Sequence, residues 1–398
     1  MAFIGTKPDS IKRANKSLIL RVVNNEGLIS RAELSRKVEL TIPTVMKIVD
    51  ELLEEELLRE VGVGESSGGR PPKLLELNSK GKHAVAVKII PDELQVGVSN
   101  LKNTFLLKKT RNIQPKAGYQ KILAELKETV RQAIKESGID WESVLGIGIG
   151  VPGVVNYLTG EVQSAPNLKG WRNVSLGSDI KDEFNVPVFV ENEARVSTLA
   201  EKWYGAGREA ENFVCIDVAV GIGSGLIIKG DIYRGFESLA GEIGHSTVIE
   251  NGHLCNCGKR GCLETVASNA AIVKSIKADP SDIIRQLCEG DKNLITMDLI
   301  IRAVKMGDGK SQRCIEKAAK YLGKVIGGLV NVVNPEIIII NGKITALGEI
   351  FFASLQDQVE RYSILGNSHP VRITSSKLGD DVGLIGAASL VLRKVFKA

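Results

Sequence analysis

The sequence lacks the features of a secreted or membrane-spanning protein. No apolar run reaches the length of about 20 residues that a membrane-spanning helix needs, and the first residues contain no apolar segment of secretory length. The net charge of +5 over 398 residues is too small to indicate a nucleic-acid partner by itself. We therefore expect a protein that stays in the cytoplasm and has no membrane partner.

Cysteine is scarce and unevenly distributed. Three of the six cysteines fall between residues 255 and 262, whereas Cys215, Cys288 and Cys314 lie in apolar or helical surroundings and are expected to be core residues. Few, clustered cysteines in a cytoplasmic chain favour metal binding over disulfide bonds.

The clustered cysteines follow a histidine in a short stretch of the chain. Cys255, Cys257 and Cys262 have the spacing C-x-C-x4-C, and His245 precedes them by ten residues. Three thiolates and an imidazole are the number and type of ligand that a structural zinc takes. The alternative is that these residues belong to an apolar core, but the residues between the cysteines are polar and turn-forming. We predict a structural Zn²⁺ at these four positions.

Two glutamates flank the predicted zinc ligands. Glu242 lies three residues before His245, and Glu264 lies two residues after Cys262. A metal that fixes this loop would also fix both carboxylates, and two fixed acceptors suit the hydroxyl groups of a sugar. Either glutamate alone would more often be a solvated surface charge.

The stretch Gly-Glu-Ile-Gly-His, followed by Cys-Asn-Cys-Gly-Lys-Arg-Gly-Cys-Leu-Glu, resembles the signature of the ROK family. That family groups sugar-responsive bacterial repressors with sugar kinases. The resemblance implies that His245 and the three clustered cysteines bind zinc, and that Glu242, His245 and Glu264 face the sugar. It extends over essentially the whole chain, and its overall likeness is to the branch of xylose repressors.

Two further stretches supply predicted sugar contacts. Residues 165–171 resemble the substrate loop of the family, which makes Asn167 a candidate contact to a sugar hydroxyl. Residues 190–194 follow a predicted strand and open a helix, so Asn192 and Glu193 are expected at the edge of the binding cleft. Asn192 is also suited to cap that helix, a role that is compatible with ligand contact.

The first 80 residues have the pattern of a winged helix-turn-helix domain. Apolar positions between residues 11 and 23 have a helical period. Ser30 and Glu33 form a predicted capping box for a short second helix. Thr41 is the predicted N-cap of a third helix, from Ile42 to about Glu56, which would be the recognition helix.

Charge is polarised within this domain. Residues 1–47 contain nine basic and four acidic side chains, whereas residues 50–60 contain six acidic and one basic. Such polarity is expected of a DNA-binding module, and a small helical protein-interaction domain is the alternative. The predicted DNA-binding residues are Ser30, Arg31, Thr41, Thr44, Lys47 and Arg70.

The wing is predicted from two short strands, at residues 58–64 and 73–78, around a loop rich in glycine, serine and proline. Gly69-Arg70-Pro71 resembles the core of an AT-hook, in which an arginine enters a narrow minor groove. A flexible interdomain linker is the alternative, because the same residue types form linkers.

The remaining residues are predicted to form two α/β lobes. Each half begins with a meander of strands and continues with helices and further strands, which looks like the actin-like, ribonuclease-H-like architecture of sugar kinases. We predict a winged helix-turn-helix domain at 1–80, lobe 1 at 81–195 and lobe 2 at 196–383. The helix at 384–398 is expected to return to lobe 1.

Three stretches differ from the kinases where those enzymes contact nucleotide. Residues 87–93 replace an Asp-x-Gly-Gly-Thr turn and contain Pro91 but no glycine, residues 219–223 lack the threonine of a second turn, and residues 340–343 replace a triple glycine. Glu193 stands where kinases usually have a catalytic aspartate, so we interpret it as a vestigial base. The protein is therefore predicted to be a sensor and not an enzyme.

We predict a transcriptional repressor of sugar-utilisation genes that binds double-stranded operator DNA and is controlled by a monosaccharide, xylose or glucose being favoured. A homodimer or a dimer of dimers is expected, because paired half-sites are the usual source of sufficient base contacts. The alternatives are an ATP-dependent sugar kinase with an appended DNA-binding domain, and a regulator that responds to a protein partner.

Overall fold

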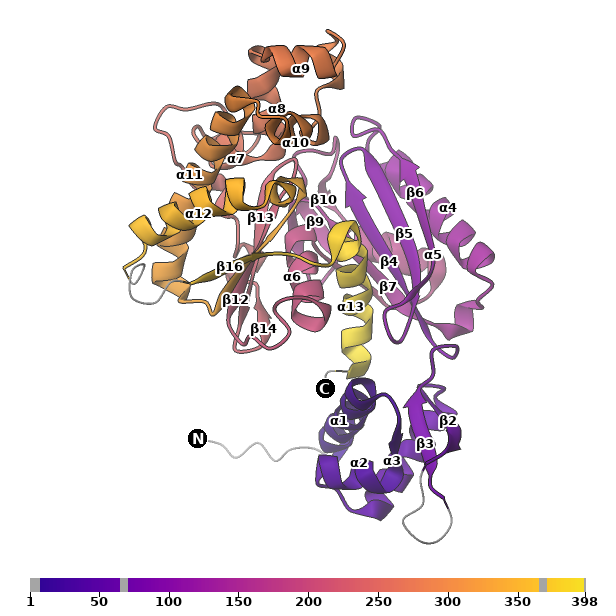
Figure 1. Cartoon of the computed structure of the whole chain (residues 1–398). Coiled ribbons are helices and arrows are strands. Elements are labelled where there is room, and N and C mark those ends of the chain that lie inside the picture. The colour runs from indigo at the N-terminus through magenta and orange to yellow at the C-terminus, as the bar shows by residue number, and fades with distance from the viewer. Residues whose placement is uncertain (1–7, 65–70, 365–370, 397–398) are drawn as a thin grey trace.

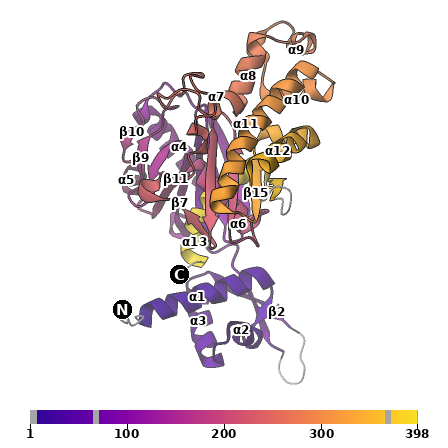
Figure 2. The same cartoon turned by 90° about the vertical axis from the view of Figure 1, so that its left-hand side faces the viewer.

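The computed structural model describes residues 8–64, 71–364 and 371–396, and it contains a small N-terminal domain below two larger α/β lobes (Figures 1 and 2). The N-terminal domain has three helices: α1 (Pro8–Glu26), α2 (Arg31–Val38) and α3 (Ile42–Glu54). Its three strands are β1 (Ile29–Ser30), β2 (Leu58–Val63) and β3 (Lys73–Leu77), in the antiparallel order β1-β3-β2. This arrangement confirms the predicted winged helix-turn-helix.

The helix starts in this domain agree only partly with the sequence prediction. The capping box of α2 is present: the Ser30 hydroxyl accepts a hydrogen bond from the Glu33 backbone N–H, and the Glu33 carboxylate accepts one from the Ser30 N–H. Thr41 occupies the N-cap of α3, but its hydroxyl pairs with that of Thr44 at 2.9 Å instead of capping the backbone. The recognition helix ends at Glu54, two residues earlier than predicted.

Lobe 1 is built on a five-stranded sheet in the order β11-β7-β4-β5-β6. The strands are β4 (His83–Ile90), β5 (Glu93–Asn100), β6 (Phe105–Asn112), β7 (Val144–Val151) and β11 (Val188–Asn192). The first three form an antiparallel meander, and β7 and β11 extend it in parallel. Helices α4 (Tyr119–Ser137) and α5 (Leu176–Phe184) pack on this lobe, and β8 (Val154–Asn156), β9 (Glu161–Ser164) and β10 (Arg172–Val174) form a small second sheet.

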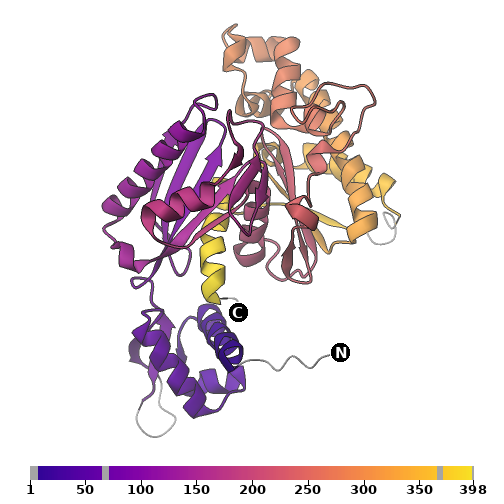
Figure 3. The ribbon, with the colours of Figure 1, turned by 180° about the vertical axis from the view of Figure 1, so that it is seen from behind.

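Lobe 2 repeats this plan with the sheet order β14-β13-β12-β15-β16. The strands are β12 (Phe213–Val218), β13 (Ile222–Ile228), β14 (Asp231–Tyr233), β15 (Ile337–Asn341) and β16 (Arg372–Ser375). Its helices are α7 (Glu264–Ala267), α8 (Asn269–Ala278), α9 (Asp282–Leu287), α10 (Met297–Lys305), α11 (Gly309–Val333) and α12 (Glu349–Tyr362). The prediction did not include α8, α9 and α10, which stand on the end of lobe 2 away from the N-terminal domain (Figure 3).

Two helices lie between the lobes and pack on each other. They are α6 (Glu193–Tyr204) and α13 (Val382–Phe396), and α13 also packs on β4 and β7 of lobe 1. A Cβ at Gly386 would overlap the carbonyl oxygen of Val196, so the two helix backbones touch where they cross. The final helix begins at Val382, two residues before the predicted start, because the preceding turn at Gly379–Asp381 leads directly into it.

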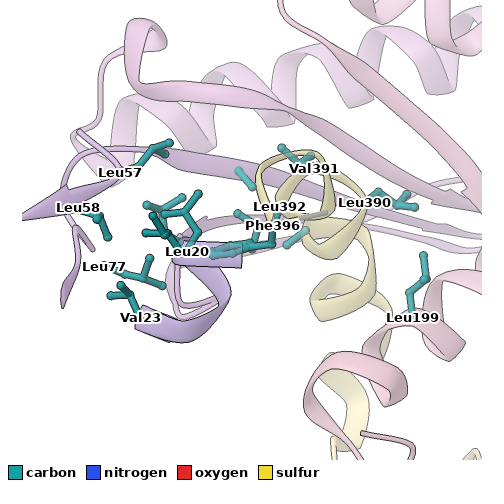
Figure 4. Close-up of a cluster of buried hydrophobic side chains, with 14 of the residues drawn as sticks. Leu20, Val23, Leu57, Leu58, Leu77, Leu199, Leu390, Val391, Leu392 and Phe396 are labelled. Carbon is teal, nitrogen blue, oxygen red and sulfur yellow. The ribbon is translucent and has the colours of Figure 1, made fainter. Parts of the chain in front are cut away.

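The far end of α13 is buried against the DNA-binding domain. Leu20 and Val23 of α1 share an apolar cluster with Leu392 and Phe396 of α13, and Figure 4 shows Leu20 beside Phe396. The Ser17 hydroxyl donates a hydrogen bond to the backbone carbonyl of Val395, the residue before Phe396. The N-terminal domain is thus attached to the lobes by a shared core as well as by the chain.

No helix in the described part of the chain is long and apolar enough to span a membrane.

Replacing Phe396 by alanine is expected to loosen the DNA-binding domain from the lobes. Phe396 is 2% exposed, and truncation of a buried phenylalanine costs about 3–5 kcal/mol of unfolding free energy. Hydrogen exchange should show lost protection in α1, with a lower melting temperature. Val332→Ala, on an 83% exposed side chain of α11, is the matched control. Unchanged protection in α1 would contradict the shared core.

Candidate functional site

The structure brings together the four predicted metal ligands. One ligand atom from each of His245, Cys255, Cys257 and Cys262 lies within 4.8 Å of all the others. His245 comes from a single turn at Ile243–His245, and the cysteines come from the following loop. The loop returns to that turn where Thr247 lies opposite Cys262, through hydrogen bonds from the Val248 N–H to the Gly261 carbonyl and from the Leu263 N–H to the Ser246 carbonyl. Four soft or borderline ligands therefore converge from a loop that has little apolar core of its own.

The distances within this cluster fit a tetrahedral metal. The sulfur atoms of Cys257 and Cys262 are 3.7 Å apart, and the Cys255 sulfur is 3.6 Å from Nδ1 of His245. Ligands at zinc-like bond lengths in a tetrahedron would be separated by about 3.8 Å for two sulfurs and about 3.6 Å for sulfur and nitrogen. Nδ1 would thus be the ligand atom, which leaves Nε2 of His245 directed away from the metal.

The two predicted carboxylates lie beside this cluster. An oxygen of Glu264 is 3.7 Å from Nδ1 of His245, and an oxygen of Glu242 is 4.0 Å from Nε2. All three side chains are partly exposed, at 19% for Glu264 and 33–36% for the other two. Burial raises the pKa of the Glu242 carboxyl, and the nearby charges of His245 and Arg195 oppose that rise. Together, these groups offer a set of hydrogen-bond partners for a polar ligand.

Asn167 joins this group from lobe 1. Its side-chain oxygen accepts a hydrogen bond of 3.0 Å from the side-chain amide of Asn256, which lies between two of the predicted metal ligands. Asn167 also lines an open hollow of about 650 Å³ with Gln114 and Lys169. A loop of lobe 1 and the metal-binding loop of lobe 2 are therefore in direct contact at a predicted sugar-binding residue.

Asn192 and Glu193 stand where β11 ends and α6 begins. The Asn192 side chain caps α6 by accepting from two backbone N–H groups, and its amide donates to the Gly153 carbonyl at 2.8 Å. Burial, reinforced by the negative charge of Asp217 and opposed by Lys88, raises the pKa of Glu193 to about 7. Glu193 is thus poised between its neutral and charged forms near neutral pH.

The turn between β12 and β13 connects the two halves of the predicted site. A Cβ at Gly221 would lie 2.9 Å from a carboxylate oxygen of Glu264, and one at Gly223 would lie 2.8 Å from the side chain of Ala194. A side chain at Gly221 would require only that the flexible end of Glu264 moves aside, whereas the contact at Gly223 leaves no room for a Cβ beside Ala194. Gly223 therefore lets β13 approach the first turn of α6 closely.

Sequence reasoning missed a buried ion network behind the site. Glu191 pairs with Arg195 at 2.8 Å and with Arg234 at 2.7 Å, and Glu191 and Arg195 are each 1% exposed. Arg195 also donates to the backbone carbonyls of Ser238 and Ala240, both at 3.1 Å. This network ties β11 and α6 to the loop that leads into Glu242. The sequence signal for this network is Arg195, an arginine that lies among apolar residues at the start of α6.

The predicted DNA-binding residues differ in how exposed they are in the structure. Thr41 and Lys47 are exposed on α3, and Thr44 is partly exposed. Ser30, in contrast, is 4% exposed and its hydroxyl forms the α2 capping box. Arg31 pairs with Asp50 at 3.1 Å and Glu60 at 2.7 Å, which ties α2 to α3 and the wing.

Ser30 and Arg31 thus have structural roles within the domain, and Ser30 also belongs to β1, which pairs with β3 of the wing. Contact of either residue with DNA stays a prediction. Arg70, the predicted minor-groove contact, lies outside the described residues.

Comparison with known proteins identifies the family. The model of the ROK family matches residues 85–394, and a winged helix-turn-helix DNA-binding model matches residues 13–59. The chain belongs to the ROK family. This ROK chain is 33% identical to a xylose repressor of Caldicellulosiruptor bescii over 384 residues, which is 96% of each chain.

Two solved structures relate the ROK chain to both branches of the family. A ROK family transcriptional regulator, described as a homolog of the E. coli MLC protein, superposes with a TM-score of 0.82 at 29% identity and covers 97% of both chains. A ROK family glucokinase from Streptomyces griseus, in complex with glucose and AMPPNP, gives 0.69 at 28% identity. That match covers 77% of this chain and 98% of the glucokinase.

Replacement of Cys257 by serine is expected to abolish metal binding. Cys257 is exposed, so the change removes little packing, and lower stability would report loss of the metal. Elemental analysis should fall from roughly one equivalent of metal per chain to near zero, with a melting temperature several degrees lower. Cys314→Ser, outside the cluster, should retain the metal. Equal metal content in the two variants would exclude the proposed ligand set.

Glu193→Gln is expected to stabilise the protein at pH 8 but not at pH 5. The folded protein holds this proton more tightly than the unfolded chain, because the pKa rises from 4.5 to about 7. The unfolding free energy of the parent protein therefore falls as pH rises through this window. The melting temperature of the variant should exceed that of the parent by a few degrees at pH 8 only. Glu209→Gln, on a 96% exposed side chain, is the control; a pH-independent difference would refute the assignment.

Proposed function

We propose that this ROK chain is a transcriptional repressor of sugar-utilisation genes, and that a monosaccharide bound between its lobes controls its affinity for double-stranded operator DNA. The sugar would be held by Asn167, Asn192, Glu193, Glu242, His245 and Glu264. The xylose repressor similar to it along nearly its whole length supports xylose as the first effector to test, with glucose next.

One structural connection carries this proposal. Asn192 and Glu193 open α6, α13 crosses α6 in backbone contact at Gly386, and the end of α13 shares a buried core with α1. A sugar that changes the angle between the lobes would displace these two helices, and α1 would follow because close-packed cores deform little. The sugar shifts DNA binding only to the extent that it prefers one lobe arrangement over the other.

The proposed metal is Zn²⁺, held by His245 and the three clustered cysteines, and its role is structural. When bound, it would hold these four side chains together and so order the loop. The chain's own residues then act on the sugar: Glu242 and Glu264 accept hydrogen bonds from hydroxyl groups, and Nε2 of His245 remains available to the ligand. Asn167 closes the site from lobe 1 through its bond to the metal loop.

We further propose that the protein does not transfer phosphoryl groups. The β4–β5 connection is a tight turn at Pro91 and Asp92 with no glycine to bring backbone N–H groups to phosphates. Lys88 stands near the start of α13, close to Gly383, and its charge acts on Glu193 and Asp217. The positive charge near Glu193, the proposed vestigial base, therefore comes from the protein's own Lys88. The alternative, an ATP-dependent sugar kinase with an appended DNA-binding domain, requires nucleotide binding at these altered turns.

We propose a homodimer or a dimer of dimers as the DNA-binding form. One recognition helix of 13 residues contacts a single half-site, and a two-fold pair reads two half-sites about one helical turn apart. Sedimentation of the purified protein measures this state directly.

A thermal-shift screen tests the proposed function. The purified protein is scanned with xylose, glucose, N-acetylglucosamine, mannose and fructose, and separately with ATP. A sugar at about 100 times its dissociation constant adds about 2.7 kcal/mol of stability, so the melting temperature should rise by several degrees with one sugar and not with ATP. The same sugar should change operator binding.

The control variant for this screen is Glu242→Gln, which keeps the size of the side chain but weakens it as an acceptor. The variant should lose most of the shift caused by the sugar. Stabilisation by ATP together with sugar phosphorylation would support the kinase alternative. No response to any sugar, with operator binding intact, would favour a regulator that answers to a protein partner.

A further inference from the structure

The outward face of α3 carries an apolar pair that the proposed sugar response does not explain. Ile42 and Met46 are 53% and 47% exposed, whereas Val45 and Val49 of the same helix are fully buried. Residues four apart lie one turn apart on one face of a helix. A single exposed apolar side chain is ordinary, but this pair forms a small apolar surface at the N-terminal half of the predicted recognition helix.

The charges around this pair fit a nucleic-acid partner. Residues 41–49 contain no acidic side chain and one basic one, Lys47, which is exposed. Two of the three carboxylates in the second half of α3 are paired within the domain: Glu51 with Lys12 and Lys16 of α1 at 2.8 and 2.9 Å, and Asp50 with Arg31 at 3.1 Å. The apolar pair therefore lies on the end of the helix that repels phosphate least.

Base edges in the major groove offer one large apolar group, the 5-methyl group of thymine. Ile42 and Met46 are separated by about 6 Å along the helix axis, and bases on one strand are stacked about 3.4 Å apart. The two side chains can therefore contact thymines within about two base steps. The β-branched Ile42 is stiff and favours one position, whereas Met46 adapts its shape to the groove.

We propose that Ile42 and Met46 read the 5-methyl groups of thymines in each operator half-site and so contribute to sequence specificity. This inference rests on the proposed DNA-binding function. Thr41, Thr44 and Lys47 supply polar contacts at the same end of the helix, and the apolar pair supplies discrimination against cytosine at the thymine positions.

The experiment replaces thymine by deoxyuridine, which removes only the methyl group. The full-length protein first selects a preferred duplex from a random-sequence pool. Each thymine of a half-site is then replaced singly, and affinity is measured by fluorescence anisotropy at one salt concentration. Uracil at one or two positions should weaken binding of the parent protein about three- to fivefold, which corresponds to one buried methyl group.

Alanine variants assign each methyl group to a side chain. Met46→Ala and Ile42→Ala should each weaken binding to the thymine duplex and each become insensitive to uracil at one position. Ile11→Ala, which changes a 50% exposed side chain on α1, is the matched control and should retain full sensitivity. All three side chains are exposed, so melting temperatures should stay unchanged and show that the variants fold.

Retention of the full uracil effect in both Met46→Ala and Ile42→Ala would overturn the inference, as would a parent protein insensitive to uracil at every position. A lower sedimentation mass of the two variants, without a change in uracil sensitivity, would also overturn it and identify the pair as an interface between copies. If the pool yields no preferred duplex, the proposed DNA-binding function itself fails.

Discussion

The arrangement of this protein depends on close backbone packing between α6 and α13. Glycine at 386 lets the two helices touch, and α13 in turn lies on the lobe 1 sheet and reaches α1 through Phe396. Because a packed core transmits displacement and does not absorb it, we expect a change in the relative position of the lobes to move the DNA-binding domain. The residues that open α6 lie in the candidate site, so this helix pair connects that site to the N-terminal domain.

The candidate site is held by three different kinds of interaction. Four side chains of the metal-binding type converge within the loop from His245 to Cys262, the side chains of Asn167 and Asn256 join the two lobes, and a buried ion network behind α6 supports the loop before Glu242. Removing these charges from water costs free energy that offsets much of their mutual attraction. The network therefore contributes more to the positions of its partners than to the stability of the fold. Its partners hold the loop between Arg234 and Gly241 against the helix that carries Glu193.

The N-terminal domain uses its charges chiefly to hold itself together. Arg31 links α2 to α3 and the wing, and the lysines of α1 neutralise the acidic end of α3. This internal pairing leaves Thr41, Thr44 and Lys47, with the apolar side chains beside them, as the outward surface of the recognition helix. A count of basic residues alone therefore overestimates how many are available to DNA.

Much of this protein was determined by the sequence alone. Local spacing was sufficient for the capping box at Ser30, the apolar period of α1, the strand meanders that open the two lobes and the cluster of His245 with three cysteines, because each depends on neighbours in the chain. Tertiary structure alone decided that Arg31 forms ion pairs with Asp50 and Glu60, that Arg195 is buried with Glu191, and that α13 packs on α1. These contacts link residues far apart in sequence or buried by other elements, and no local pattern encodes which partner a side chain meets.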